Sequence, residues 1–253
     1  MVEFSVEGYS QLLSTLKDQG YSFCGYEEID SRLAEGRPFV VLRHDIDISL
    51  RAVLEIARVE HEHGVQATYF VLLRSPFYNV LSRFSAEIMS QIHDYGHQIA
   101  THADPAAYDN DCARALTEVE VFSKFYPYIN TEIASFHSSY DLHHMPIDSF
   151  QQINNVYGSC VRGDVTYISD STGRWRYGHP LESEAFNTRK PIQLLTHPIW
   201  WVQEGETPAE KLERWLYDDF HNNRLTLKKF LPKLFKLDEE ASNPQEALVG
   251  RAQ

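Results

Sequence analysis

The chain has 253 residues, of which 43% are apolar and 23% charged, a balance that fits one globular domain and excludes disorder for most of its length. Acidic residues outnumber basic ones by 36 to 23, and the net charge of −13 makes nucleic acid and anionic membrane surfaces poor partners. No apolar run reaches the ~20 residues of a membrane span, and the first residues lack a signal-peptide pattern. We therefore expect a cytoplasmic protein without membrane insertion.

The first part of the chain is predicted to form a helical cap. Apolar residues recur at helical spacing over residues 6–19 and again near residues 27–34. A short segment at residues 21–24 is predicted to be extended.

The middle of the chain alternates between short apolar runs and amphipathic segments. The runs are typical of strands that are buried on both faces. They cover residues 39–42, 67–73, 98–100, 133–136 and 192–195, with weaker candidates at 156–160 and 165–168. Periodicity and capping residues predict helices between Ser49 and Gly64, over residues 85–95, and over residues 111–125. This alternation predicts an α/β protein.

The C-terminal part begins with a predicted helix and ends in a polar segment. Thr207 and Glu210 form a capping box with Pro208 at the first helical position. The expected buried stripe of this helix consists of Leu212, Trp215, Leu216 and Phe220. Residues 238–253 lack periodicity and are predicted to be a disordered tail. We expect one domain over residues 1–237, with a motif-bearing core at 39–201.

Five of the predicted strands end in charged or titratable residues. These residues are Asp45 and Asp47, Arg74, His102, His137, and His197. In a parallel α/β fold the carboxyl ends of the strands gather on one face, so these side chains are expected to converge.

The two aspartates indicate a metal site. Asp45 and Asp47 alternate along an extended segment and point the same way, and two such carboxylates stay ionised together when a cation lies between them. Carboxylate and imidazole ligands suit zinc or another divalent first-row ion. The alternative is that Asp47 only caps the following helix.

Three ordered motifs resemble those of the polysaccharide deacetylase family, the NodB-like carbohydrate esterases. Arg43-His44-Asp45-Ile46-Asp47 is similar to the first motif of a divergent branch with the pattern His-Asp-x-Asp. The segment 96–102, Gly-His-Gln-Ile-Ala-Thr-His, resembles the second motif, and 194–198, Leu-Leu-Thr-His-Pro, resembles the last. The resemblance implies a distorted (β/α)7 barrel that removes acyl groups from sugars with the help of a metal ion.

The resemblance also implies roles for single residues. Asp45 corresponds to the general base and His197 to the general acid, while Asp47 and His102 correspond to metal ligands. The family's second metal histidine is replaced here by Ala106.

Two departures from the family pattern have candidate replacements. A three-ligand site needs one more contributor, for which Asp104 or His137 is the nearest candidate by motif. Arg162, Arg174 and Arg43 are the candidates to replace the arginine expected in the third motif.

Other polar and aromatic residues around the motifs are candidates for substrate binding. They are Arg74, Tyr78, Asp170, Arg174 and Trp175. Flat rings with a polar tip pack against sugars, and charged groups bind hydroxyls or a carboxylate.

The combined prediction is a metal-dependent hydrolase that cleaves the amide carbon–nitrogen bond of an N-acetylated sugar or sugar-linked precursor, of the kind found in bacterial surface polysaccharide pathways. The cofactor is expected to be a divalent ion, zinc in the first instance. Two alternatives are a non-catalytic carbohydrate-binding scaffold on a degenerate barrel and a metal-dependent hydrolase of another amide. Metal content discriminates between the enzyme and the scaffold.

Overall fold

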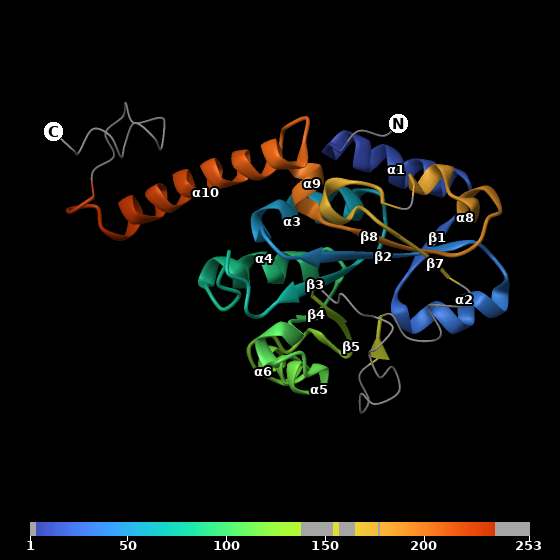
Figure 1. The fold of residues 1–253 in the computed structure, drawn as a ribbon, viewed down its shortest axis with the longest axis horizontal. Helices are drawn as coiled ribbons and strands as arrows, with labels where there is room; N and C mark the ends of the chain where they lie inside the picture. The colour runs from blue at the N-terminus through green and yellow to red at the C-terminus, as the bar shows by residue number, and fades with distance from the viewer. Residues whose placement is uncertain (1–3, 138–153, 157–164, 177, 236–253) are drawn as a thin grey trace. The chain divides into compact units, whose positions relative to one another are not determined.

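The computed structural model describes residues 4–137, 154–156, 165–176 and 178–235 (Figure 1). The chain groups into two compact units, Met1–Val202 and Gln203–Gln253. The first unit carries all of the motifs, and it ends next to the expected end of the motif-bearing core.

The first unit is built around one sheet whose pairings are all parallel. Its strand order is β6-β5-β4-β3-β2-β8-β7, and β1 pairs with the first part of β2. The strands are β1 (Ser22–Cys24), β2 (Phe39–Ile46), β3 (Thr68–Leu72), β4 (Gln98–Ala103), β5 (Asn130–Phe136), β6 (Asn154–Asn155), β7 (Thr166–Ser169) and β8 (Ile192–Thr196). The predicted α/β class is confirmed. Within the described residues no pairing joins β6 to β7, so closure into a barrel stays a prediction.

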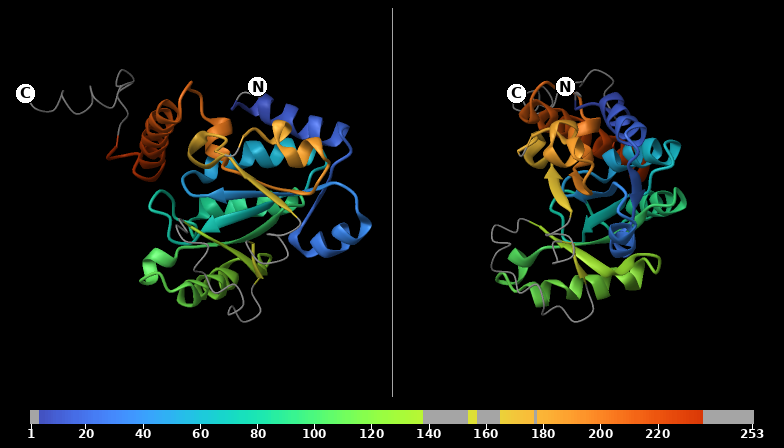
Figure 2. Two further views of the ribbon diagram at one scale, coloured as in Figure 1. Left: turned by 45° about the vertical axis from the view of Figure 1, so that its right-hand side comes forward. Right: turned by 90° about the vertical axis from the view of Figure 1, so that its right-hand side faces the viewer.

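Helices connect the strands and cover the outer side of the sheet (Figure 2). The helices of the first unit are α1 (Val6–Asp18), α2 (Ile29–Glu35), α3 (Leu50–Glu62), α4 (Arg83–Asp94), α5 (Cys112–Ala115), α6 (Thr117–Phe125), α8 (Glu184–Asn187) and α9 (Pro198–Val202). The Ser49 side chain caps α3 as expected, and Gly64 and Gly96 adopt positive φ after α3 and α4. The helix expected over 111–125 is divided into α5 and α6 at Leu116. The Leu116 carbonyl accepts a hydrogen bond from Val119 N, three residues later, as in a 3-10 turn.

Strand β2 extends past the predicted apolar run because the polar residues that follow it have partners in the interior. All eight of its residues are buried. Its outer side presents His44, whose Nε2 lies 2.6 Å from the carboxylate of Glu60 on α3. The hydroxyls of Tyr9 and Tyr69 donate to the same carboxylate, and both tyrosines are fully buried. Glu60 therefore links α1, α3, β2 and β3 through a buried polar network.

We expect Glu60→Ala to lower the free energy of unfolding by about 3–5 kcal/mol. The change removes the buried carboxylate that accepts hydrogen bonds from the groups around it, and these groups stay buried without an acceptor. Glu62→Ala is the matched control, since Glu62 lies on the same helix and forms an exposed pair with Arg58. Chemical denaturation of both variants tests this. Equal and small effects of the two changes would contradict the assigned role of Glu60.

The second unit contains the helix α10 (Pro208–Phe230), which begins at the predicted capping box of Thr207 and Glu210. The expected buried stripe is wrong in part. Trp215 is buried, but Leu216 and Phe220 are 56% and 41% exposed. Periodicity identifies the apolar side of a helix without saying what covers it. None of the described helices is both long enough and apolar enough to cross a membrane.

Candidate active site

Arg43 and Asp45 lie on the inner side of β2 and form a buried ion pair. The Arg43 guanidinium donates to both carboxylate oxygens, with distances of 3.1 Å from Nε to Oδ1 and 2.6 Å from Nη2 to Oδ2. Burial alone would raise the pKa of Asp45, but the charges of Arg43 and His102 outweigh it and hold the pKa below its ordinary value. Asp45 is therefore an ionised carboxylate at neutral pH.

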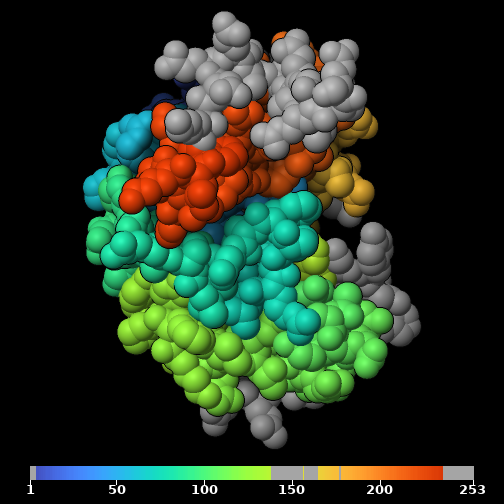
Figure 3. Space-filling model, turned by 90° about the vertical axis from the view of Figure 1, so that its left-hand side faces the viewer, coloured from blue at the N-terminus to red at the C-terminus, as the bar shows by residue number. Residues whose placement is uncertain are grey.

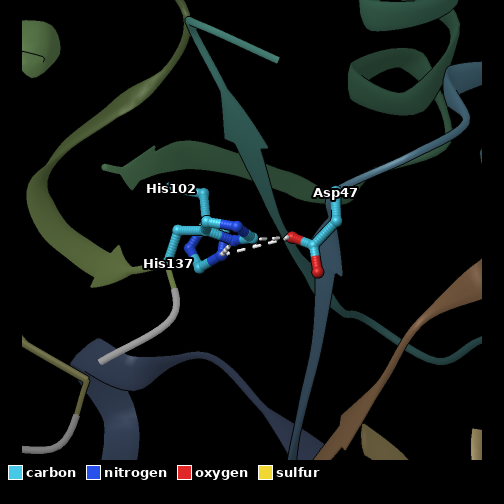
Figure 4. A group of neighbouring side chains, drawn as sticks. All are labelled: Asp47, His102 and His137. Carbon is cyan, nitrogen blue, oxygen red and sulfur yellow. Dashed lines mark hydrogen bonds and ion pairs between the residues drawn. The ribbon is translucent and has the colours of Figure 1, made fainter. Parts of the chain in front are cut away.

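Asp47 faces two histidines that come from the ends of other strands. Its Oδ1 lies 3.3 Å from Nε2 of His102, at the end of β4, and 3.3 Å from Nδ1 of His137, which follows β5 (Figure 4). The two ring nitrogens are 3.3 Å apart. The sheet thus brings together three ligand-type atoms from segments that are spread over about ninety residues of the sequence, all within 4.8 Å of one another.

The donor set fits a divalent metal ion. Asp47 Oδ1 is buried, and no hydrogen bond of good geometry reaches it from the described residues, although both imidazole nitrogens point at it. A buried carboxylate oxygen without a donor is costly, and a cation between the oxygen and the two nitrogens would satisfy all three atoms. Two imidazoles and one carboxylate are a ligand set that zinc accepts.

Neighbouring groups orient this cluster. Ser135 Oγ, on β5, lies 2.6 Å from Nδ1 of His102, the ring nitrogen that faces away from Asp47. Burial raises the pKa of Asp47, but the close approach of the His102 and His137 rings and the charges of His102 and His197 bring it well below its ordinary value. The interaction with Asp47 in turn raises the pKa of His137.

On the other side of Asp47, His197 is held by a buried carboxylate. His197 Nδ1 donates to Asp170 Oδ1 at 2.6 Å, and its backbone N–H lies 3.1 Å from each Asp170 oxygen. Trp201 Nε1 donates to Asp170 Oδ2 at 2.8 Å. Burial lowers the pKa of His197, but Asp170 outweighs this effect and raises the pKa to about 9. The other ring nitrogen of His197, Nε2, lies 3.8 Å from Asp47 Oδ2.

A small cavity of about 30 Å³ is lined by residues of β2 and the start of α9, including Asp45, Asp47 and His197. This volume is sufficient for one water molecule. The cavity is thus lined by the ionised carboxylate of Asp45, the protonated imidazole of His197 and the Asp47 carboxylate of the three-residue cluster, and it has the size of an attacking water.

The structure separates the two candidates for the third ligand. His137 lies in the cluster, whereas Asp104 caps the short 3-10 helix Pro105–Tyr108 by accepting from Ala106 N. Of the candidate arginines, Arg43 contacts Asp45 and Arg174 is exposed. Arg162 lies outside the described residues.

The role predicted for Asp170 differs from the one that the structure shows. Asp170 was expected to bind substrate hydroxyls, but it is fully buried and its oxygens accept bonds from His197 and Trp201. The carboxylate therefore has a positioning role. No sequence motif marks it, because its partners lie more than 25 residues away; the position at the end of a strand was the only available signal.

The setting predicted for Trp175 also differs from the one that the structure shows. The Trp175 ring stacks on Phe4 at a centroid distance of 5.6 Å and meets Trp201 edge-on at 6.0 Å. It belongs to an aromatic cluster rather than to an open loop surface, because the residues around it supply apolar rings to pack against.

The remaining substrate candidates, Tyr78 and Arg74, differ in their exposure and in their contacts. The hydroxyl of Tyr78 donates to Ile46 O at 2.6 Å and accepts from Leu72 N at 3.1 Å, so it joins the ends of β2 and β3. Arg74 is exposed, and its guanidinium lies over the ring of Tyr108. Its loop, between β3 and α4, is on the turquoise surface in Figure 3. Ser135, by contrast, was not predicted, since a serine inside a strand carries no sequence signal.

No protein-family model and no curated protein matches the chain. Among solved structures, the chain is similar to the deacetylase PplD of Streptococcus pyogenes in complex with acetate, with 16% identity over 83% of this chain and 86% of that chain and a TM-score of 0.43. It is also similar to a family 4 carbohydrate esterase from Bacillus anthracis, with 16% identity over 84% and 86% of the two chains and a TM-score of 0.40. At this distance the likeness says nothing about activity, so the chemistry has to be inferred from the residues of the site.

Proposed function

We propose that the protein is a metal-dependent hydrolase that removes an acetyl or other acyl group from a sugar or sugar-linked precursor. The observation that carries the proposal is the buried oxygen of Asp47 facing His102 and His137, with Asp45 and His197 beside it. The sugar part of the proposal rests on the three motifs that resemble those of polysaccharide deacetylases.

The metal ligands in this proposal are Asp47, His102 and His137. A divalent ion held by them, zinc in the first instance, would polarise the acyl carbonyl and make an attacking water more acidic. Because the three ligand-type side chains are all present and face one another, the non-catalytic scaffold is the weaker alternative.

Asp45 and His197 each carry out one of the two proton transfers in this proposal. Asp45 starts ionised because Arg43 and His102 lower its pKa, so it accepts the proton of the attacking water. His197 starts protonated because Asp170 raises its pKa to about 9, so it donates a proton to the leaving amine or hydroxyl. The two groups thus begin with the opposite protonation states that acyl transfer needs.

The direct test is release of acetate from N-acetylated sugar oligomers by protein loaded with zinc. We expect acetate and a free amine in equal amounts, loss of activity with a chelator, and recovery when zinc is added back. A protein that holds stoichiometric zinc and releases no acetate from either N-acetylated or O-acetylated sugars would contradict the proposed function.

We expect Ser135→Ala to weaken zinc binding by about tenfold to a hundredfold, because the hydroxyl orients the ring of His102 from its far side. Ser169→Ala is a matched control: Ser169 is also buried in a strand, but its hydroxyl bonds to Ser171. Competition with a chromogenic chelator measures both dissociation constants. An unchanged constant for Ser135→Ala would remove Ser135 from the site.

A further inference from the structure

Helix α10 carries a row of exposed apolar residues at the spacing of a coiled-coil contact. Leu216, Phe220, Leu227 and Phe230 follow one another at intervals of four, seven and three residues, and Asn223 occupies the one polar position of the same row. The four apolar side chains are between 41% and 76% exposed. We call these five residues the α10 seam; the helix that carries them is labelled in Figure 1.

The seam is flanked by charges of opposite sign. Asp219 precedes Phe220 and Arg224 follows Asn223, at the two positions that border the contact in a paired helix. Within one chain, Asp219 accepts a bond from the Asn223 amide, and the Arg224 guanidinium lies over the ring of Phe220. The two charges lie on opposite sides of the row, so they complement each other across two helices.

We propose that the α10 seam docks against the α10 seam of a second copy of this chain, parallel and in register. In that arrangement each apolar residue meets its own counterpart, and the Asn223 amides meet each other, where each can donate to and accept from the other. Asp219 of each copy then faces Arg224 of the other, which gives two symmetric ion pairs.

The chain's own C-terminal segment is a poorer occupant. Residues 236–253 offer only Leu237, Leu248 and Val249 as large apolar residues, too few to cover the seam at helical spacing. A second copy supplies both the apolar row and the complementary charges.

The first test measures the molar mass of the full chain over a wide range of concentrations by sedimentation equilibrium. We expect a dimer for the wild type, a monomer for Phe220→Glu, and a dimer for His221→Glu, which adds the same charge at the next residue, roughly 100° around the helix and outside the seam. A wild type that stays monomeric, or a Phe220→Glu variant that stays dimeric, would overturn the proposal. Helix content by circular dichroism checks that both variants fold.

A charge exchange tests the register and cannot be mimicked by misfolding. We expect Asp219→Lys to weaken association by roughly threefold to tenfold, since it removes two attractive ion pairs and creates repulsion. The double variant Asp219→Lys with Arg224→Asp should recover the wild-type dissociation constant. Failure to recover would contradict the parallel, in-register pairing.

Discussion

Asp47→Ala is expected to abolish stoichiometric metal binding and to reduce acyl hydrolysis by about 10³-fold or more. The change removes the only carboxylate of the three-residue cluster and leaves two imidazoles, which hold a divalent ion weakly. The loss of the metal then removes the main source of charge stabilisation in acyl transfer. Elemental analysis and acetate release on the same preparation measure both effects.

Asp104→Ala is the matched control for Asp47→Ala. Both residues directly follow a strand at the same end of the sheet, but the Asp104 side chain accepts from Ala106 N and lies outside the cluster. We expect this variant to keep its metal and its activity, with a small loss of stability from the missing cap. Metal retained by Asp47→Ala, or lost from Asp104→Ala, would show that the ligands are assigned wrongly.

The sequence predicts the sheet well because its strands are short apolar runs between capped helices. The ends of these runs also identify the residues that converge on the site, since parallel strands carry them to one edge. This is why Asp47, His102 and His137 could be named before their distances were known. Strand β2 was underestimated because Arg43 and Asp45 are polar, and only their mutual pairing explains their burial.

The sequence does not reveal what covers or holds a side chain from a distant segment. Asp170 and Trp175 had the residue types of a sugar-binding loop, yet one is bound by His197 and the other packs on Phe4. For α10 the periodicity correctly predicted a helix, but it did not show that Leu216 and Phe220 of the predicted buried stripe are exposed. Such assignments depend on tertiary neighbours, which local patterns do not encode.

His197→Ala is expected to lower kcat by about 10²-fold to 10⁴-fold, the usual contribution of general acid–base catalysis, with little loss of metal. His197 must be protonated when the leaving group departs, so activity should fall as the pH rises through about 9. Below that pH the imidazole carries its proton and this limb of the profile is flat. Steady-state kinetics across neutral and alkaline pH measure the limb.

The same pKa difference predicts a pH-dependent contribution to stability. The pKa of His197 is about 9 in the folded protein and 6.5 is its ordinary value, so the Asp170–His197 pair stabilises the fold fully below about pH 6.5. The contribution is lost as the pH rises from there through about 9. Thermal unfolding at a series of pH values should show this decline.

Asp170→Asn distinguishes a catalytic His197 from a merely structural one. An amide still accepts a bond from His197 but carries no charge, so the pKa of the imidazole should fall towards its ordinary value and the alkaline limb should move to lower pH with it. A residue that only supports the loop would lower the melting temperature on substitution and leave the pH profile where it was. An alkaline limb that does not move in Asp170→Asn, together with a fully active His197→Ala variant, would remove His197 from the mechanism.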